Sequence, residues 1–174
     1  MSTAGIVRPL LEGGDRRSIA QSNRARALVE RNPSLVTGLA ELANDEDWLV
    51  SQRALDLLEK IAHIHPEWIE PHKDVFIGPC AESDKWEIRL QVVRALPLFT
   101  WKSRDLARVT TILRENVTYP QIFVRAWALD SLATFAMKDT RLMQLVRRHL
   151  ADFEASESKA LRARARKIRQ RLAH

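Results

Sequence analysis

The sequence has few of the residues that build disulfide frameworks, glycine-rich loops and membrane spans. It contains one cysteine (Cys80), five glycines and one tyrosine in 174 residues. A single cysteine cannot form an internal disulfide and fits a reducing compartment. No apolar run approaches the roughly 20 residues that a transmembrane helix requires, and no charged and then apolar leader opens the sequence. We therefore expect a soluble, cytoplasmic protein that does not span a membrane.

Other features of the composition favour an ordered, helical chain. Hydrophobic residues make up 45% of the sequence, and there are only five glycines and seven prolines, which argues against disorder. Ala, Leu, Arg and Glu dominate, and long β-branched runs are missing, as in helical proteins. The length is sufficient for one domain with a buried core. We predict a single all-α domain over residues 1–174.

The excess of positive charge lies at one end of the sequence. Residues 138–174 contain 11 Lys and Arg against 4 Asp and Glu, whereas residues 1–137 contain 17 against 18. The net charge of +6 therefore comes from the last fifth of the chain. An argument for nucleic-acid binding from overall charge is weakened by this uneven distribution.

Helix-breaking residues divide the sequence into ten helical segments, which alternate as first and second members of five pairs. In the first pair we expect a short helix over Ala4–Glu12 and a second helix from Asp15, its N-cap, to about Arg31. In the third pair, Pro66–Ile77 is expected to be helical in part, with a kink at Pro71. The five pairs cover approximately residues 1–31, 33–63, 66–99, 103–137 and 139–174.

One segment, Gln121–Ala136, has an apolar layout that recurs along the chain. Aligning the copies at Val50, Ile88, Val124 and Leu161 gives offsets of 36 to 38 residues. The position four residues later is small or β-branched in each copy: Ala54, Val92, Ala128 and Ala165. Helix pairs that repeat at this period are typical of an α-solenoid.

The copies also share an acidic residue before the second helix and a basic residue inside it. The acidic position holds Glu46, Asp84 and Glu157, and the basic position holds Arg89, Arg125 and Arg162. This pattern, with cores such as Val124-Arg125-Ala126, resembles HEAT repeats. The resemblance implies a right-handed α-solenoid of about five HEAT-like helix pairs, around ten helices, with these acids and bases paired as a ladder between neighbouring repeats. Ser51 and Pro120 depart from the pattern, so the ladder would be incomplete.

Two aligned columns are apolar in the middle copies and basic in the last. The columns are Leu55, Val93 and Leu129, and Leu58, Leu96 and Leu132. We expect them to be buried against a neighbouring repeat. In the last copy they become Arg166 and Arg169, as expected where no further repeat covers the helix.

Three further columns are mostly charged and form one stripe along the second helices. The first column is Arg24, Arg53, Gln91, Trp127 and Arg164, the second is Ala27, Asp56, Arg94, Asp130 and Lys167, and the third is Arg31, Lys60, Leu98, Thr134 and Arg171. Eight of their fifteen positions are basic and two are acidic. Because second helices line the concave face of a helix-pair solenoid, we predict a basic groove, although charged columns can also be simply solvated. The candidate partner-binding residues are Arg24, Arg31, Arg53, Lys60, Arg94, Trp127, Asp130, Arg164, Lys167 and Arg171.

No residue cluster predicts a metal, a cofactor or a catalytic nucleophile. His63 and His65 point apart on a helix, and Cys80 lacks a histidine partner or a basic pocket. Gly13-Gly14 lacks the lysine and the preceding strand of a phosphate-binding loop.

Trp127 and Asp130 form the one pair with a chemical interpretation. HEAT-like alkylpurine DNA glycosylases are similar in carrying an aromatic residue and an essential carboxylate on a basic concave face. The alternative is structural: Trp127 packs on the inner helix of the next repeat, and Asp130 pairs with Arg94.

The interpretation we favour is a non-enzymatic adaptor or scaffold, favoured as a monomer, that presents a basic concave groove to an acidic or helical segment of another protein. The alternative is nucleic-acid binding through the same groove, with base excision as a remote extension.

Overall fold

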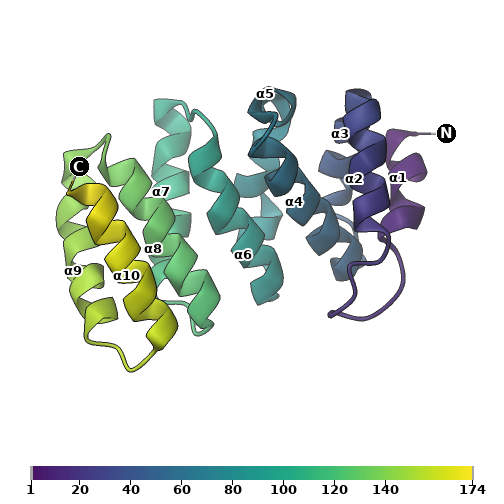
Figure 1. Ribbon diagram of the computed structural model, residues 1–174. Coiled ribbons are helices and arrows are strands. Elements are labelled where there is room, and N and C mark those ends of the chain that lie inside the picture. The colour runs from purple at the N-terminus through teal and green to yellow at the C-terminus, as the bar shows by residue number, and fades with distance from the viewer. Residues whose placement is uncertain (1, 174) are drawn as a thin grey trace. The chain divides into compact units, whose positions relative to one another are not determined.

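The structure is a computed structural model that describes residues 2–173. It contains ten α-helices and, within the described range, no strand, which confirms the prediction of an all-α chain with about ten helices. The helices form two compact units, Met1–Thr100 and Trp101–His174, here called the N-terminal and C-terminal units (Figure 1). The division falls between the third and fourth predicted helix pairs. The single domain over residues 1–174 stays a prediction.

Within the described residues, the N-terminal unit contains six α-helices and four 3-10 segments. Helix α4 packs against α2, α3 and α6, and α1 packs against α2 and α3. The α-helices are α1 (Thr3–Leu11), α2 (Ser22–Arg31), α3 (Val36–Leu42), α4 (Trp48–Ala62), α5 (Pro66–Ile69) and α6 (Trp86–Ala95). The 3-10 segments are η1 (Pro33–Leu35), η2 (Glu70–Ile77), η3 (Pro79–Glu82) and η4 (Leu96–Leu98).

Proline and capping residues explain several of these boundaries. The α5 helix becomes the 3-10 segment η2 at Glu70, and Pro71 lies in its first turn, which confirms the prediction that this stretch is only partly α-helical. The N-cap of α4 is Asp47, whose carboxylate accepts a hydrogen bond from the backbone N–H of Leu49 at 2.9 Å.

The C-terminal unit is built around α8. Helix α8 (Ile122–Ala136) packs against α7 (Ser103–Val117), α9 (Met143–Glu154) and α10 (Lys159–Leu172), with a 3-10 segment η5 (Thr140–Leu142) before α9. Its observed bounds agree with the predicted helix over Gln121–Ala136, where Gln121 is the N-cap. None of the described helices is both long and apolar enough to cross a membrane.

One predicted helix begins six residues later than expected. The stretch from Asp15 to Gln21 belongs to a loop, and α2 starts at Ser22, so the prediction of a helix capped by Asp15 is wrong. The backbone takes positive φ angles at Gly13, Gly14 and Ala20, which no α-helix contains. Residues 12–21 therefore form an irregular connection between α1 and α2.

The apolar columns are buried, as predicted. Leu55, Leu58, Val93, Leu96, Leu129 and Leu132 have no exposed surface. Their counterparts in α10, Arg166 and Arg169, are both exposed, and Arg169 forms an ion pair with Glu154 of α9. The change from leucine to arginine in the last copy thus marks a solvent-facing side of α10.

The arginine shared by three copies of the repeat donates hydrogen bonds to backbone carbonyls. Arg89 donates a hydrogen bond to the carbonyl of Ser83, Arg162 to that of Ser156, both at 2.5 Å, and Arg125 to that of Val117 at 3.3 Å. In each case the carbonyl belongs to the chain that leads into the arginine's own helix. The shared arginine therefore fixes the entry of α6, α8 and α10, a contact that the predicted ladder did not include.

Candidate functional site

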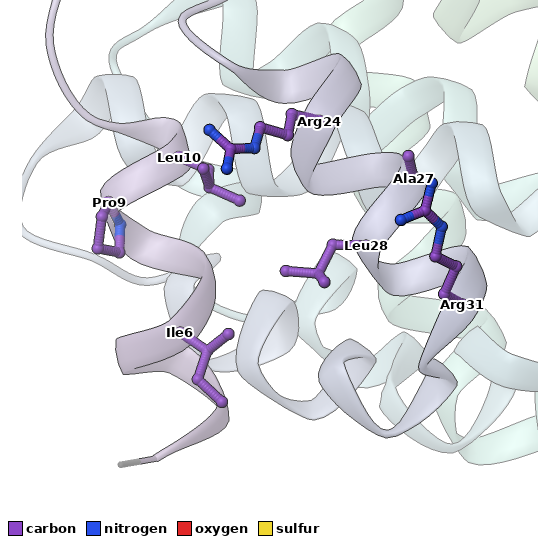
Figure 2. A pocket seen from close by; sticks show the side chains of 7 residues that line it. All are labelled: Ile6, Pro9, Leu10, Arg24, Ala27, Leu28 and Arg31. Carbon is purple, nitrogen blue, oxygen red and sulfur yellow. The ribbon is translucent and has the colours of Figure 1, made fainter.

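Two of the predicted arginines lie beside a pocket between α1 and α2 (Figure 2). The pocket has a volume of about 540 Å³. Arg24 and Arg31 are seven residues apart on α2, about 10.5 Å along the helix axis, and Leu28 lies between them. The lining residues are Ile6, Pro9 and Leu10 from α1, and Arg24, Ala27, Leu28 and Arg31 from α2. This site thus combines an apolar wall with two exposed cations.

Neither of these arginines has a counter-charge in the part of the chain that the structure describes. Arg24 donates a hydrogen bond to the side-chain oxygen of Gln21 at 3.2 Å, which leaves its charge uncompensated. Arg31 has no ion pair within residues 2–173 and is exposed. Both remain available to an anionic group.

The next two predicted residues, Lys60 and Arg94, have carboxylate partners inside the N-terminal unit. Lys60 pairs with Asp56 at 2.6 Å, one helical turn earlier on α4. Arg94 of α6 pairs with Glu59 at 3.0 Å, and the same carboxylate oxygen meets the ring of His63 at 2.8 Å. Sequence columns did not single out Glu59, although its position beside Lys60 on a second helix places it near the stripe. Its side chain is almost fully buried.

The predicted exposure of Arg53 is wrong, since only 2% of this residue is accessible. Its guanidinium lies under the loop of residues 12–21 and makes five hydrogen bonds to four backbone carbonyls. The accepting carbonyls belong to Leu11, Gly13, Asp15 and Ser18, at distances of 2.5 to 3.2 Å. The loop, which the helix prediction missed, is what covers this side chain.

In the C-terminal unit, Asp130 of α8 is enclosed by two arginines of α10. Arg164 pairs with one carboxylate oxygen at 2.6 Å and Arg171 with the other at 2.7 Å. Arg171 also donates to the backbone carbonyl of Asp130 at 2.8 Å. Asp130 is 8% exposed, and the two arginines already neutralise its charge inside the unit. Arg94 belongs to the other unit, and its predicted pairing with Asp130 stays a prediction.

Trp127 lies next to this cluster on α8. The guanidinium carbon of Arg164 is 3.9 Å from the centroid of the Trp127 ring, a cation–π distance. The prediction that Trp127 packs on the inner helix of the following repeat is thereby confirmed. Lys167 of α10 is exposed and has no ion pair within the described residues. Lys167 is thus an uncompensated cation, like Arg24 and Arg31.

The remaining candidates for chemistry are placed as follows. No group of three or more His, Cys, Asp or Glu side chains is arranged to hold a metal ion within residues 2–173. His65 stacks on Trp68 with 3.8 Å between the ring centroids. Burial raises the pKa of the Cys80 thiol to about 12, and the thiol donates to the carbonyl of Val75 at 2.8 Å. Such a thiol is a poor nucleophile at neutral pH.

Comparison with known proteins identifies the architecture. No family model and no curated protein sequence matches the chain. Among solved structures, an archaeal HEAT-like repeats protein from Thermococcus onnurineus NA1 is similar with a TM-score of 0.60 and 19% identity, over 95% of this chain and 63% of that one. A designed armadillo repeat protein, solved in complex with the peptide (KR)4, is similar with a TM-score of 0.62 and 14% identity, over 94% and 79% of the two chains.

The fold is that of HEAT and armadillo repeat proteins. An engineered protein with 19% identity and a TM-score of 0.62 is also similar, over 95% of this chain and 77% of that one. At such identities the likeness shows the α-solenoid fold, which hosts many unrelated functions. Function must therefore be argued from the side chains of this chain.

Proposed function

We propose that this protein is a non-enzymatic adaptor whose second helices bind an acidic or helical segment of another protein. The observation that carries the proposal is a set of three exposed cations, Arg24, Arg31 and Lys167, that have no ion pair within the described residues and lie on helices of a repeat fold. Repeat solenoids commonly serve as extended binding surfaces. The residues we propose for binding are Arg24, Arg31, Lys60 and Arg94 in the N-terminal unit and Trp127, Asp130, Arg164, Lys167 and Arg171 in the C-terminal unit, without Arg53.

The sign of the charge determines the partner we propose. The similar armadillo protein is in complex with (KR)4, a basic peptide. The uncompensated side chains of the present chain are themselves basic, so electrostatic complementarity favours an acidic segment. Arg164 and Arg171 already neutralise Asp130, so they contribute less to this attraction than Arg24, Arg31 and Lys167, which have no ion pair within residues 2–173.

The contacts of Asp130 also argue against the base-excision interpretation. A carboxylate that stabilises positive charge developing on a sugar has to face that charge. Instead, each carboxylate oxygen of Asp130 forms an ion pair with an arginine, and the guanidinium of Arg164 lies over the Trp127 ring. Nucleic-acid binding without chemistry remains the alternative that the same cations would support.

The test is a titration of the full chain against a fluorescently labelled, alternating Asp/Glu peptide and against duplex DNA over a series of salt concentrations. We expect the peptide to bind, with affinity that falls as salt rises. The triple variant Arg24→Glu, Arg31→Glu, Lys167→Glu should weaken binding by about tenfold or more. A matched charge reversal at the exposed Arg147 and Arg148 of α9 should have little effect.

Two results would count against the adaptor. Binding of DNA but not of the acidic peptide, with loss in the triple variant, would replace it with the nucleic-acid alternative. Absence of binding to either probe at low salt would remove both.

A further inference from the structure

We propose that the pocket between α1 and α2 is the docking site for one acidic, amphipathic helix of a partner protein. An apolar side chain of that helix would enter the pocket, and two carboxylates on either side would pair with Arg24 and Arg31. The inference rests on the proposed protein-binding function and adds a location and a recognition pattern to it.

The walls of the pocket suit an apolar side chain. The side chains of Leu10 and Leu28 point toward each other across the space between the two helices, and Ile6, Pro9 and Ala27 also line the pocket (Figure 2). Ile6 is 39% exposed, a large fraction for a side chain that also lines a concave site. The volume of about 540 Å³ is within the usual range for binding sites, roughly 300–1,000 Å³. Burial of an apolar side chain here would remove apolar surface on both partners from water.

The two cations define the spacing of the partner's acidic residues. Arg24 and Arg31 are two turns apart on one helix, about 10.5 Å along its axis. Carboxylates at positions i and i+7 of a partner helix have the same separation and lie nearly on one face, with positions i+3 and i+4 between them. An arginine can hold a carboxylate in two parallel hydrogen bonds, which adds geometric selectivity.

The pocket is formed before any partner binds, because α1 is held by helices other than α2. The backbone of Thr3 and Ala4 approaches Gly38 of α3 so closely that a Cβ on Gly38 would lie 2.5 Å from it. Arg8 of α1 donates two hydrogen bonds to Asp45, at 2.8 and 3.1 Å. A preformed site loses less conformational entropy on binding than one that must assemble.

Arg53 completes this support at the other end of α1. Its guanidinium binds the carbonyls of Leu11 and Gly13, at the last residue of α1 and just beyond it. The helix is thus fixed near its start, in its middle and at its end by α3 and α4 and the turn between them.

The apolar wall favours a peptide over a nucleic acid as the occupant. A phosphate backbone would use Arg24 and Arg31 but would gain nothing from Ile6, Leu10 and Leu28. An amphipathic acidic helix uses both kinds of side chain, so loss of either kind should weaken its binding.

The experiment uses the full chain and a fluorescein-labelled helical peptide with Glu at i and i+7 and Leu at i+3 and i+4 in an Ala/Gln background. Binding is measured by anisotropy for the wild type, Arg24→Gln with Arg31→Gln, Ile6→Gln and the control Arg26→Gln. Arg26 lies on the same helix but pairs with Glu30, and Ile6 is exposed enough for its variant to fold. We expect the double arginine variant and Ile6→Gln each to weaken binding by about tenfold, and the control to change it less than about twofold.

Matched peptides and a second readout separate the possible outcomes. Peptides with both Leu or both Glu changed to Gln should bind the wild type more weakly, and hydrogen exchange should slow in α1 and α2 when the parent peptide is bound. Equal binding by the wild type and all variants would overturn the pocket while the adaptor function survives. If the wild type does not bind this peptide but still binds the alternating Asp/Glu peptide, the pocket proposal is likewise overturned and the adaptor function is retained. Loss in the arginine variant but not in Ile6→Gln would show general attraction to anions and overturn the helix-docking proposal.

Discussion

Replacement of Arg53 by methionine tests whether this arginine is structural or belongs to a binding surface. The variant keeps an unbranched apolar side chain but removes the guanidinium that bonds to four carbonyls of residues 11–18. We expect the free energy of unfolding to fall by about 3 kcal/mol. The loop of residues 12–21 should also become more mobile.

The magnitude follows from the exposure of the carbonyl partners. A hydrogen bond to a charged group contributes roughly 1.5–3 kcal/mol when its partner would otherwise stay buried and unpaired. Residues 12–19 are exposed, so most of the released carbonyls can bind water and recover part of that energy. Leu11 has no exposed surface, and the bond to its carbonyl is the shortest of the five, at 2.5 Å. One contribution near the full value and smaller ones from the exposed carbonyls give about 3 kcal/mol in total.

The assay is urea unfolding followed by circular dichroism, together with limited trypsin digestion. Arg16 and Arg17 lie in the loop and should be cleaved faster in the variant. Arg53→Lys keeps the charge with fewer donors and should be intermediate, and Arg26→Met at an exposed pair should change stability little. Wild-type stability and unchanged cleavage in Arg53→Met would refute the reasoning. If Arg53→Met lost ligand binding at wild-type stability, Arg53 would have to be assigned to the binding surface.

Four further predictions test other parts of the fold. Gly38→Ala should lower the free energy of unfolding by about 1–3 kcal/mol, because the added Cβ would lie 2.5 Å from the backbone of α1. Thermal unfolding measures this effect, and an unchanged midpoint would mean that α1 is not held there. Leu129→Arg should lower the free energy of unfolding by about 3–5 kcal/mol, because the substitution places an unpaired charge at a site with no exposed surface. Near-wild-type stability would show that this column is not buried. With a pKa of about 12, roughly one Cys80 thiol in 10,000 is ionised at pH 8. A thiol reagent should therefore modify the native protein far more slowly than the denatured protein. Equal rates of modification would contradict a buried thiol. The hydrogen bond from Arg8 lowers the pKa of Asp45, so this pair stabilises the fold at neutral pH and its contribution is lost as the pH falls through that lowered pKa. Asp45→Asn should therefore be less stable than the wild type at about pH 7, and the difference should shrink as the pH falls below the ordinary range of an aspartate. A difference between the two urea midpoints that stays constant over this pH range would contradict the assignment.

Much of the helical framework could be predicted because its signals are local. The periodic apolar positions of Gln121–Ala136 and their copies identify second helices, and the buried Leu129 and the exposed Arg166 follow from comparing those copies. Aligned positions report which side of a helix a residue occupies. They work best for short side chains, whose surroundings are set by the helix that carries them.

The same comparison predicted less about long charged side chains. Arg53 and Arg24 occupy one column, yet Arg53 is buried beneath a loop and Arg24 is exposed beside a pocket. The difference depends on residues 12–21, where Ala20 takes a φ of 48° that sequence patterns did not reveal. Asp130 is similar, because its burial depends on the reach of Arg164 and Arg171 from another helix.

The pocket between α1 and α2 depends on contacts that lie outside it. Gly38, the Arg8–Asp45 pair and Arg53 hold α1 against α3, α4 and the turn between them, and none of these side chains except that of Arg8 comes from the two helices that form the walls. If α1 were held by α2 alone, the two apolar faces would be free to close on each other and bury Ile6 and Leu28. In the structure the apolar surface of Ile6 and Leu28 stays open beside Arg24 and Arg31, which have no ion pair within residues 2–173. Open apolar surface beside two exposed cations adds nothing to folding, and the proposed partner helix of opposite charge would cover both.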